Sequence, residues 1–157
     1  MAHFRLERVV FQSTPVTSNG VAYATGEQIG AVNTITQAVA DTRGTVQLES
    51  IVVIDKHKQK AAIDVFFFDQ VPALTSVDNG AFTLPTAELL KCIGVVSIAA
   101  ADYADTAAQA VATVRRIDLI LQAVAKKRDL YYVLVSRGTP TYASTSGLVL
   151  KFGLLQP

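Results

Sequence analysis

VQLESIVVIDKHKQKAAIDVFFF, residues 46–68, contains the strongest strand signal in the chain. Residues 51–54 are an apolar run, residues 55–60 contain no apolar side chain, and residues 61–68 return to mainly apolar and aromatic ones. β-Branched and aromatic residues fit a pleated surface. A polar connection between two such runs is typical of a hairpin with a solvent-exposed turn. The stretch therefore predicts two neighbouring strands.

The return strand carries aromatic rings on both of its faces. Side chains alternate along a strand, so Phe66 and Phe68 point to one face and Phe67 to the other. Burying each ring contributes roughly 1.5–3 kcal/mol, so we expect both faces to be covered. One cover is the core of the domain. The other is a second sheet, a loop or another protein chain, and the pattern leaves these three alternatives open.

Runs of the same kind recur along the rest of the chain. Residues 32–39, 93–98, 129–135 and 148–155 predict strands. Residues 107–124 combine alanines that favour a helix with an alternation that favours strands, and we interpret them as strand. One short helix is expected at residues 83–91, because Pro85 suits a first helical turn and Glu88 suits its positive end. Short strands without long intervening helices predict a single all-β domain over residues 1–157, as a sandwich, jelly roll or barrel.

Composition restricts the partners that we expect. The 157 residues suit one domain, and fourteen basic residues nearly balance thirteen acidic ones, without the dense basic cluster of a nucleic-acid binder. The short basic groups at residues 56–60, 115–116 and 126–128 are interpreted as solvated turns. Cys92 is the single cysteine, so no internal disulfide forms. The longest apolar run, residues 95–101, is too short to span a bilayer. We therefore expect a soluble protein, made in a cytoplasm, with neither a nucleic-acid nor a membrane partner.

No motif in the sequence indicates catalysis, a metal or another cofactor. His3 and His57 lack the spaced ligands of a metal site, and no Gly-x-Ser-x-Gly nucleophile turn occurs. The prediction is therefore a protein without enzymatic activity and without a cofactor. A set of aromatic residues offers a stacking platform for sugars or bases as an alternative to simple packing: Tyr131, Tyr132, Tyr142 and Phe152.

Three stretches carry a resemblance to a known family: residues 23–30, residues 54–69, and the run from Leu130 to Tyr142 that continues to Leu148 and Leu150. Together they resemble small proteins encoded beside the major capsid protein in tailed bacteriophages, the capsid decoration or cement proteins. The resemblance implies an all-β, jelly-roll-like sandwich or barrel with one short helix. It also implies a structural role on the outer capsid surface, after synthesis in the host cytoplasm. The implied partners are the major capsid protein and further copies of the chain, as a homodimer or homotrimer.

An alternative function is a carbohydrate-binding or receptor-binding β module of the virion, with the tyrosines named above as stacking residues.

Six residues are the predicted partner interface, because they are apolar and lie near the N-terminus or on the second face of the aromatic strand: Phe4, Leu6, Val9, Phe11, Phe66 and Phe68. Residues 1–20 have two interpretations. They are either the first strand of the body or an arm that adds to a neighbour's sheet or lies on the capsid.

Overall fold

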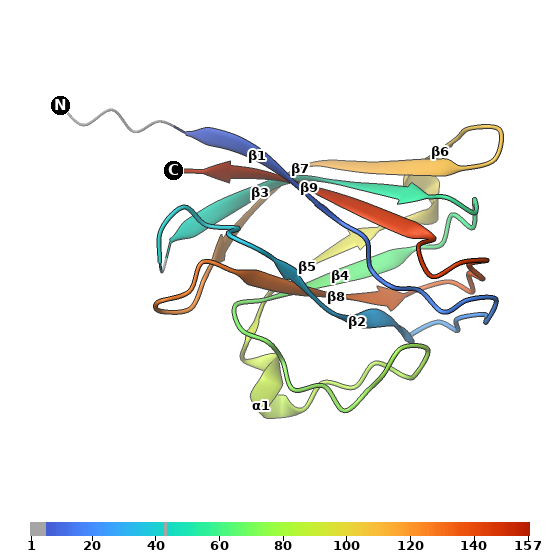
Figure 1. Cartoon of the computed structure of the whole chain (residues 1–157), viewed down its shortest axis with the longest axis horizontal. Helices are drawn as coiled ribbons and strands as arrows, with labels where there is room; N and C mark the ends of the chain where they lie inside the picture. Colours follow the sequence, from blue (N-terminus) through green and yellow to red (C-terminus); the bar gives the residue numbers. More distant parts are fainter. Residues whose placement is uncertain (1–5, 43) are drawn as a thin grey trace.

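The structure, a computed structural model, describes residues 6–42 and 44–157, which form two antiparallel sheets packed face to face (Figure 1). Within these residues there are nine strands: β1 Glu7–Ser13, β2 Gln28–Ile35, β3 Thr45–Asp55, β4 Ile63–Phe68, β5 Cys92–Ile98, β6 Tyr103–Asp105, β7 Ala110–Gln122, β8 Leu130–Ser136 and β9 Leu148–Gln156. The helical turns are α1, Thr86–Leu89, and a 3₁₀ turn at Ala100–Asp102. The predicted all-β fold with one short α-helix is confirmed.

The strand order identifies the fold as a jelly roll. One sheet has the order β1-β9-β3-β7-β6 and the other has the order β2-β8-β4-β5. The pairs β1·β9, β2·β8, β3·β7 and β4·β5 are nested along the chain and fall alternately in the two sheets. This is the double-sheet arrangement of eight strands called a jelly roll, with β6 added beyond β7. We call the first sheet the upper sheet and the second the lower sheet, as they lie in Figure 1.

The core fills the space between the sheets. Its largest fully buried side chains include Ile51 of β3, Phe67 of β4, Tyr132 of β8 and Phe152 of β9. The Phe152 ring meets the Phe67 ring at a centroid distance of 5.8 Å and the Tyr132 ring at 5.0 Å. The first of these contacts is edge-to-face and the second is tilted, and both join the two sheets.

The hairpin predicted for residues 46–68 is wrong. β3 lies in the upper sheet and β4 in the lower sheet, so the two strands do not pair. The connection between them crosses the end of the sandwich around the buried carboxylate of Asp55. That carboxylate accepts hydrogen bonds from the backbone N–H of His57, at 3.0 Å, and of Lys60, at 2.7 Å. The polar residues therefore build a corner between sheets rather than a tight turn.

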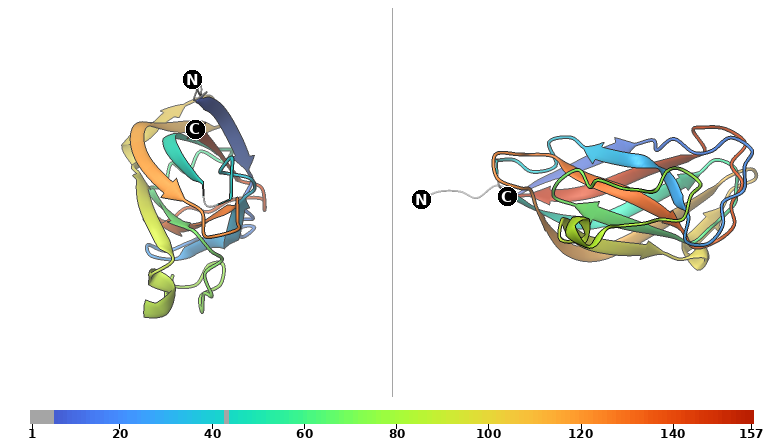
Figure 2. Two further views of the ribbon diagram at one scale, coloured as in Figure 1. Left: turned by 90° about the vertical axis from the view of Figure 1, so that its left-hand side faces the viewer. Right: turned by 90° about the horizontal axis from the view of Figure 1, so that it is seen from below.

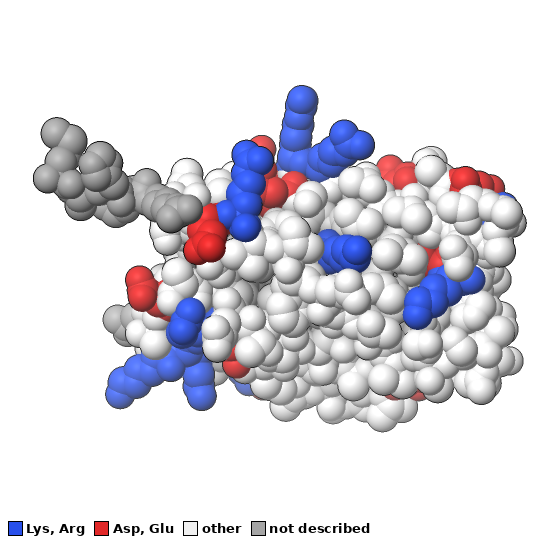
Figure 3. All heavy atoms as spheres, turned by 45° about the horizontal axis from the view of Figure 1, so that its top comes forward, with Lys and Arg blue, Asp and Glu red and all other residues white. Residues whose placement is uncertain are grey.

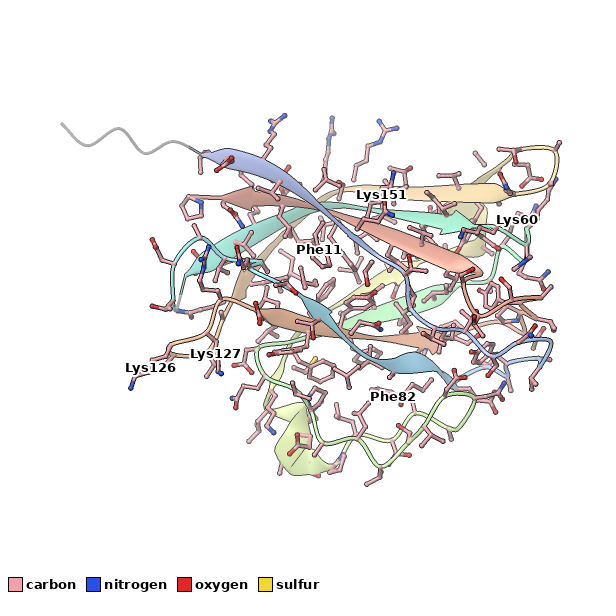
Figure 4. The ribbon with its side chains drawn as sticks, in the orientation of Figure 1. Phe11, Lys60, Phe82, Lys126, Lys127 and Lys151 are labelled. Carbon is pink, nitrogen blue, oxygen red and sulfur yellow. The ribbon has the colours of Figure 1, made fainter. Side chains whose placement is uncertain are left out.

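The beginning of the described chain belongs to the body. β1 pairs with β9 from Glu7 to Ser13, and Phe11 packs against the core, between the two sheets in Figure 4. Beyond β1, the N–H of Thr17 bonds to the Thr145 carbonyl and the N–H of Gly20 bonds to the Tyr142 carbonyl. Residues 7–13 therefore form an edge strand of the chain's own sheet, and residues 14–20 follow as a loop bonded to residues 142 and 145. Residues 1–5 lie outside the described residues, and the choice between a first strand and an arm stays a prediction.

None of the helices in the described part of the chain has the length and apolarity needed to cross a bilayer.

Candidate interaction surfaces

A single segment of the chain covers much of the outer face of the lower sheet. Residues 69–91, which we call the lid segment, leave β4, run below the sheet, form α1 and return at β5 (Figures 1 and 2). The Phe82 ring of the lid segment lies 5.0 Å from the Phe66 ring of β4, centroid to centroid. Phe68, Val133 and Val135, which face the same way, are 0–1% exposed. Of the three covers left open by the sequence, the structure shows a loop of the same chain.

Phe68 is therefore not available to a partner, and its prediction as an interface residue is wrong. Phe66 is half-buried, because the Phe82 ring of the lid segment packs against its ring. Figure 4 shows Phe82 below β2.

The four N-terminal residues of the predicted interface have different positions. Leu6 is 60% exposed, whereas Val9 and Phe11 are half-buried on the inward side of β1. Phe4 lies outside the described residues. The structure does not bring these residues together with Phe66, because they belong to different sheets. Their interface role stays a prediction.

The lid segment is held to the body by backbone pairing and by one carboxylate. Gln28 donates its N–H to the Gly80 carbonyl at 2.9 Å, and Phe82 donates its N–H to the Gly26 carbonyl at 2.9 Å. Asp78 accepts from the Tyr23 hydroxyl at 2.7 Å, from the Gly30 N–H at 2.7 Å and from the Ser18 hydroxyl. These contacts join the lid segment to three separate parts of the chain and give it a defined position.

The outer surface of the lid segment exposes several large apolar side chains to solvent. Val71 is 56% exposed, Val77 70%, Leu89 53% and Leu90 86%. A groove of about 460 Å³, which Val77 helps to line, lies between the lid segment, β2 and residue 16. Its apolar lining is formed by Val16, Val32, Pro72, Leu74 and Val77. Sequence reasoning missed this surface, because scattered apolar residues in a loop have no periodicity. The available signal was the number of large apolar side chains in a stretch that has no strand alternation.

The polar residues of the groove are already satisfied within the chain. The buried Gln28 donates its amide to the Gly30 carbonyl at 2.7 Å and accepts from the Ser76 hydroxyl at 2.7 Å. Asp78 has the three donors named above. Since these groups have their partners, the groove offers mainly apolar contact to whatever binds it.

The aromatic residues of the alternative function do not form a stacking platform. Tyr132, Tyr142 and Phe152 are each 0% exposed. Burial raises the pKa of the Tyr132 and Tyr142 hydroxyls above the ordinary value for tyrosine. Tyr131 alone is partly exposed, and a single ring does not make a sugar-binding face.

Over residues 6–42 and 44–157, no group of three or more His, Cys, Asp and Glu side chains is placed to hold a metal ion. The short helix keeps Glu88 within 2.6 Å of the Lys91 ammonium, and this hydrogen bond lowers the pKa of the Glu88 carboxyl. Glu88 also accepts from the backbone N–H of Ala73 at 2.7 Å, so these charges fasten the lid segment to itself.

Comparison with known proteins gives neither a family model nor a curated protein that matches the chain. Among solved structures, one from turnip yellow mosaic virus is similar to the chain at 15% identity and a TM-score of 0.36, covering 99% of this chain and 81% of that one. One from desmodium yellow mottle tymovirus is similar at 13% identity and a TM-score of 0.28, covering 99% of this chain and 82% of that one. TM-scores below 0.5 do not establish a common fold, and the assignment as a jelly roll rests on the strand order.

Proposed function

We propose that this chain is a structural virion protein that decorates and stabilises a phage capsid by binding the lattice of the major capsid protein. In this proposal it acts on the outer capsid surface, after synthesis in the host cytoplasm, and as a homodimer or homotrimer. The proposal assigns it no catalytic activity. It joins the sequence resemblance to capsid decoration proteins with the surface of the lid segment.

The observation that carries the proposal is the exposure of Leu89 and Leu90 on a segment fixed to a closed β-body. Transfer of a leucine side chain from water to an apolar contact contributes roughly 1.5–3 kcal/mol. The chain leaves Leu90 86% exposed, so most of this free energy is available to an intermolecular contact. The body is already ordered around the lid segment, which lowers the entropic cost of binding.

Repetition of the contact over a lattice would give it strength. A contact of a few kcal/mol is weak for one molecule, but linked copies bind with an effective concentration set by their spacing. An oligomer that engages two or three neighbouring capsid subunits would therefore remain bound through individually modest interfaces. This is the physical basis on which a small protein clamps a shell against internal pressure.

Sedimentation of the purified protein with undecorated capsids tests the proposal. We expect saturable binding by the native chain and a loss of at least about tenfold in affinity for the double variant Leu89→Ser/Leu90→Ser. The matched control is Ile120→Ser, because Ile120 is 68% exposed on the upper sheet, away from the lid segment. Absence of saturable binding by the native chain at any salt concentration would overturn the proposed function. Equal losses in the variant and the control would assign the binding to another surface.

A further inference from the structure

A second surface, on the upper sheet, has the features of a binding site. A hollow of about 350 Å³ opens on the outer face of that sheet. It is lined by Arg8, Val9, Val10, Glu49, Ser50, Arg115, Arg116, Gly153 and Leu154. Figure 3 shows several Lys and Arg side chains spread over this side of the molecule, with Asp and Glu side chains among them, on a surface that is otherwise mostly uncharged.

Strand register explains the floor of the hollow. Val10 of β1 pairs with Gly153 of β9, Gly153 pairs with Ser50 of β3, and Ser50 pairs with Arg115 of β7. These four residues form one row across the sheet. Of the two central residues, Gly153 has no side chain and Ser50 has a small one. A Cβ built on Gly153 would overlap the Ser50 hydroxyl, so the floor is packed as closely as the backbone allows. Three strand spacings of about 4.8 Å make the row roughly 14 Å long.

A bulge in β7 places two consecutive arginines on the same side. In a regular strand Arg115 and Arg116 would point to opposite faces. Here the register of β3 and β7 shifts between Leu48 and Ser50, so that residues 116–118 of β7 lie opposite Glu49. Arg116 has a φ of 55° and Asp118 a φ of 53°, in the left-handed region. Both arginines are consequently exposed and both line the hollow.

The three arginines around the hollow form no ion pair in the described part of the chain, and one carboxylate, that of Glu49, shares the lining with them. The ion pairs found among residues 6–42 and 44–157 involve Lys58, Lys60, Lys91 and Arg137. Arg8, Arg115 and Arg116 are not among them. Lys151 follows in the next row on the same face, where it pairs with Gln12 and Val52 (Figure 4). The positive φ angle of Arg116 costs about 1–3 kcal/mol of backbone strain, and its side chain is exposed and forms no ion pair among the described residues.

We propose that this hollow binds a carboxylate-bearing, extended segment of a partner protein. Guanidinium groups match carboxylates in bidentate geometry, so Arg115 and Arg116 would bind acidic side chains of the segment. Arg8 lies on β1, two residues before Val10, and also lines the hollow. Val10 is 68% exposed and offers an apolar contact beside the charges. The carboxylate of Glu49 in the lining disfavours a uniformly charged phosphate backbone and suits a segment of mixed composition. No aromatic ring lines the hollow to stack a base.

This site differs from the surface of the lid segment, because the two lie on the outer faces of opposite sheets. Its partner chemistry is also different: charge complementarity in the hollow, and apolar burial at the lid segment. The two proposals can therefore fail separately.

Fluorescence polarisation with a labelled peptide of alternating glutamate and valine residues tests the inference. We expect saturable binding to the native chain that weakens with salt, and a loss of about tenfold or more for Arg115→Ala/Arg116→Ala. The matched control is Lys126→Ala/Lys127→Ala, an adjacent basic pair at the tip of the β7–β8 connection (Figure 4), for which we expect no more than about a threefold change. The lid variant Leu89→Ser/Leu90→Ser should bind the peptide as the native chain does.

A second variant tests the site independently, in case the double arginine variant does not fold. Ser50→Asp introduces a carboxylate on the floor, in the position of the ligand, and should abolish peptide binding while the thermal midpoint stays near that of the native chain. Absence of peptide binding to the native chain would overturn the proposal. So would equal losses in the two basic pairs, or unimpaired binding by Ser50→Asp. A single-stranded oligonucleotide that bound more tightly than the peptide would identify a nucleic-acid surface and also overturn it.

Discussion

Asp78 lies in a surface loop, but its carboxylate accepts three hydrogen bonds from other parts of the chain. Its carboxylate joins Ser18, Tyr23 and Gly30, which are brought together from the segment before β2 and from β2 itself. Hydrogen bonds to a charged group contribute more than neutral ones, and loss of the acceptor leaves donors without a partner. At residues 76–80 this carboxylate adds to the backbone pairing of Gln28 with residues 79 and 80 and to the hydrogen bond between Ser76 and Gln28.

Asp78→Ala should lower the free energy of unfolding by roughly 2–4 kcal/mol, because the hydroxyl of Tyr23 and the N–H of Gly30 lose their acceptor. Urea denaturation monitored by circular dichroism measures the change. Asp41→Ala is the control, since Asp41 is exposed and its carboxylate has no hydrogen bond among the described residues; we expect a change within about 0.5 kcal/mol. A loss below roughly 1 kcal/mol for Asp78→Ala would show that the lid segment is held mainly by backbone pairing.

The buried tyrosines predict a stability limit at alkaline pH. Burial, together with Asp78, raises the pKa of Tyr23 to about 12, and burial raises the pKa of Tyr103, Tyr132 and Tyr142 as well. In the unfolded chain these hydroxyls ionise near pH 10. The folded state binds more protons above that pH, so the stabilisation is complete below about pH 10 and is lost as the pH rises toward the folded-state values.

Urea midpoints at pH 8, 9 and 11.5 should therefore be similar at the first two values and lower at the third. Tyr23→Phe should reduce the difference between pH 8 and pH 11.5, because it removes one of the titrating groups. An unchanged midpoint at pH 11.5 would mean that these hydroxyls reach solvent in the folded protein.

At the scale of the element, the bulge in β7 stores strain that a single substitution can release. A left-handed conformation costs a residue with a side chain about 1–2 kcal/mol, whereas glycine adopts it freely but adds about 0.5–1 kcal/mol of unfolded-state entropy. Arg116→Gly should therefore stabilise the fold by about 0.5–1 kcal/mol in chemical denaturation while it weakens binding of the acidic peptide.

The control for this prediction is Arg115→Gly. Arg115 is not among the residues with positive φ, so glycine should there destabilise the strand by about 0.5–1 kcal/mol. Opposite signs at two adjacent positions would locate the strain at residue 116. A loss of stability in both variants would contradict the interpretation of the bulge as strained.

The existence of the strands was predictable from sequence, but their partners were not. Alternation predicted β7 and β9 within a few residues, because the period of two reflects the two faces of a sheet. The pairing of β3 with β7 and β9 is between residues far apart in the chain, and no local pattern specifies it. The prediction of a hairpin failed for this reason.

For the surfaces, too, local sequence patterns predicted which residues are covered but not which parts of the chain cover them. The aromatic strand correctly indicated two covered faces, but the identity of the second cover required the path of the lid segment. The pair Arg115-Arg116 was interpreted as a solvated turn, since only the register shift in β7 shows that both side chains lie over Gly153. Phe4 remains a prediction, and Phe68 was wrong because burial of a ring does not distinguish a partner chain from a loop.

At the scale of the whole molecule, the first strand pairs within the upper sheet and is also bonded to the lower sheet. β1 is the edge of the upper sheet and pairs with β9 along its length. Ser13 accepts a hydrogen bond from the hydroxyl of the buried Tyr132 at 2.6 Å, which links the upper-sheet edge to the lower sheet. A segment used in this way stabilises the free protein, whereas an arm would become ordered only on assembly.

Two deletions separate these roles. Removal of residues 2–5 should leave the thermal midpoint unchanged, because β1 begins at Glu7. Removal of residues 2–14 should lower it by on the order of 10 °C or more, since several kcal/mol are lost and each shifts the midpoint of a domain of this size by roughly 2–4 °C. Phe11 contributes to that loss through burial, and Tyr132 through its unpartnered hydroxyl. Differential scanning calorimetry of both deletions, before any capsid is added, gives the comparison. The longer deletion could instead keep the midpoint of the native chain and bind capsids much more weakly. That result would show that the N-terminal segment acts as an arm and that the pairing of β1 with β9 is not needed for the stability of the free protein.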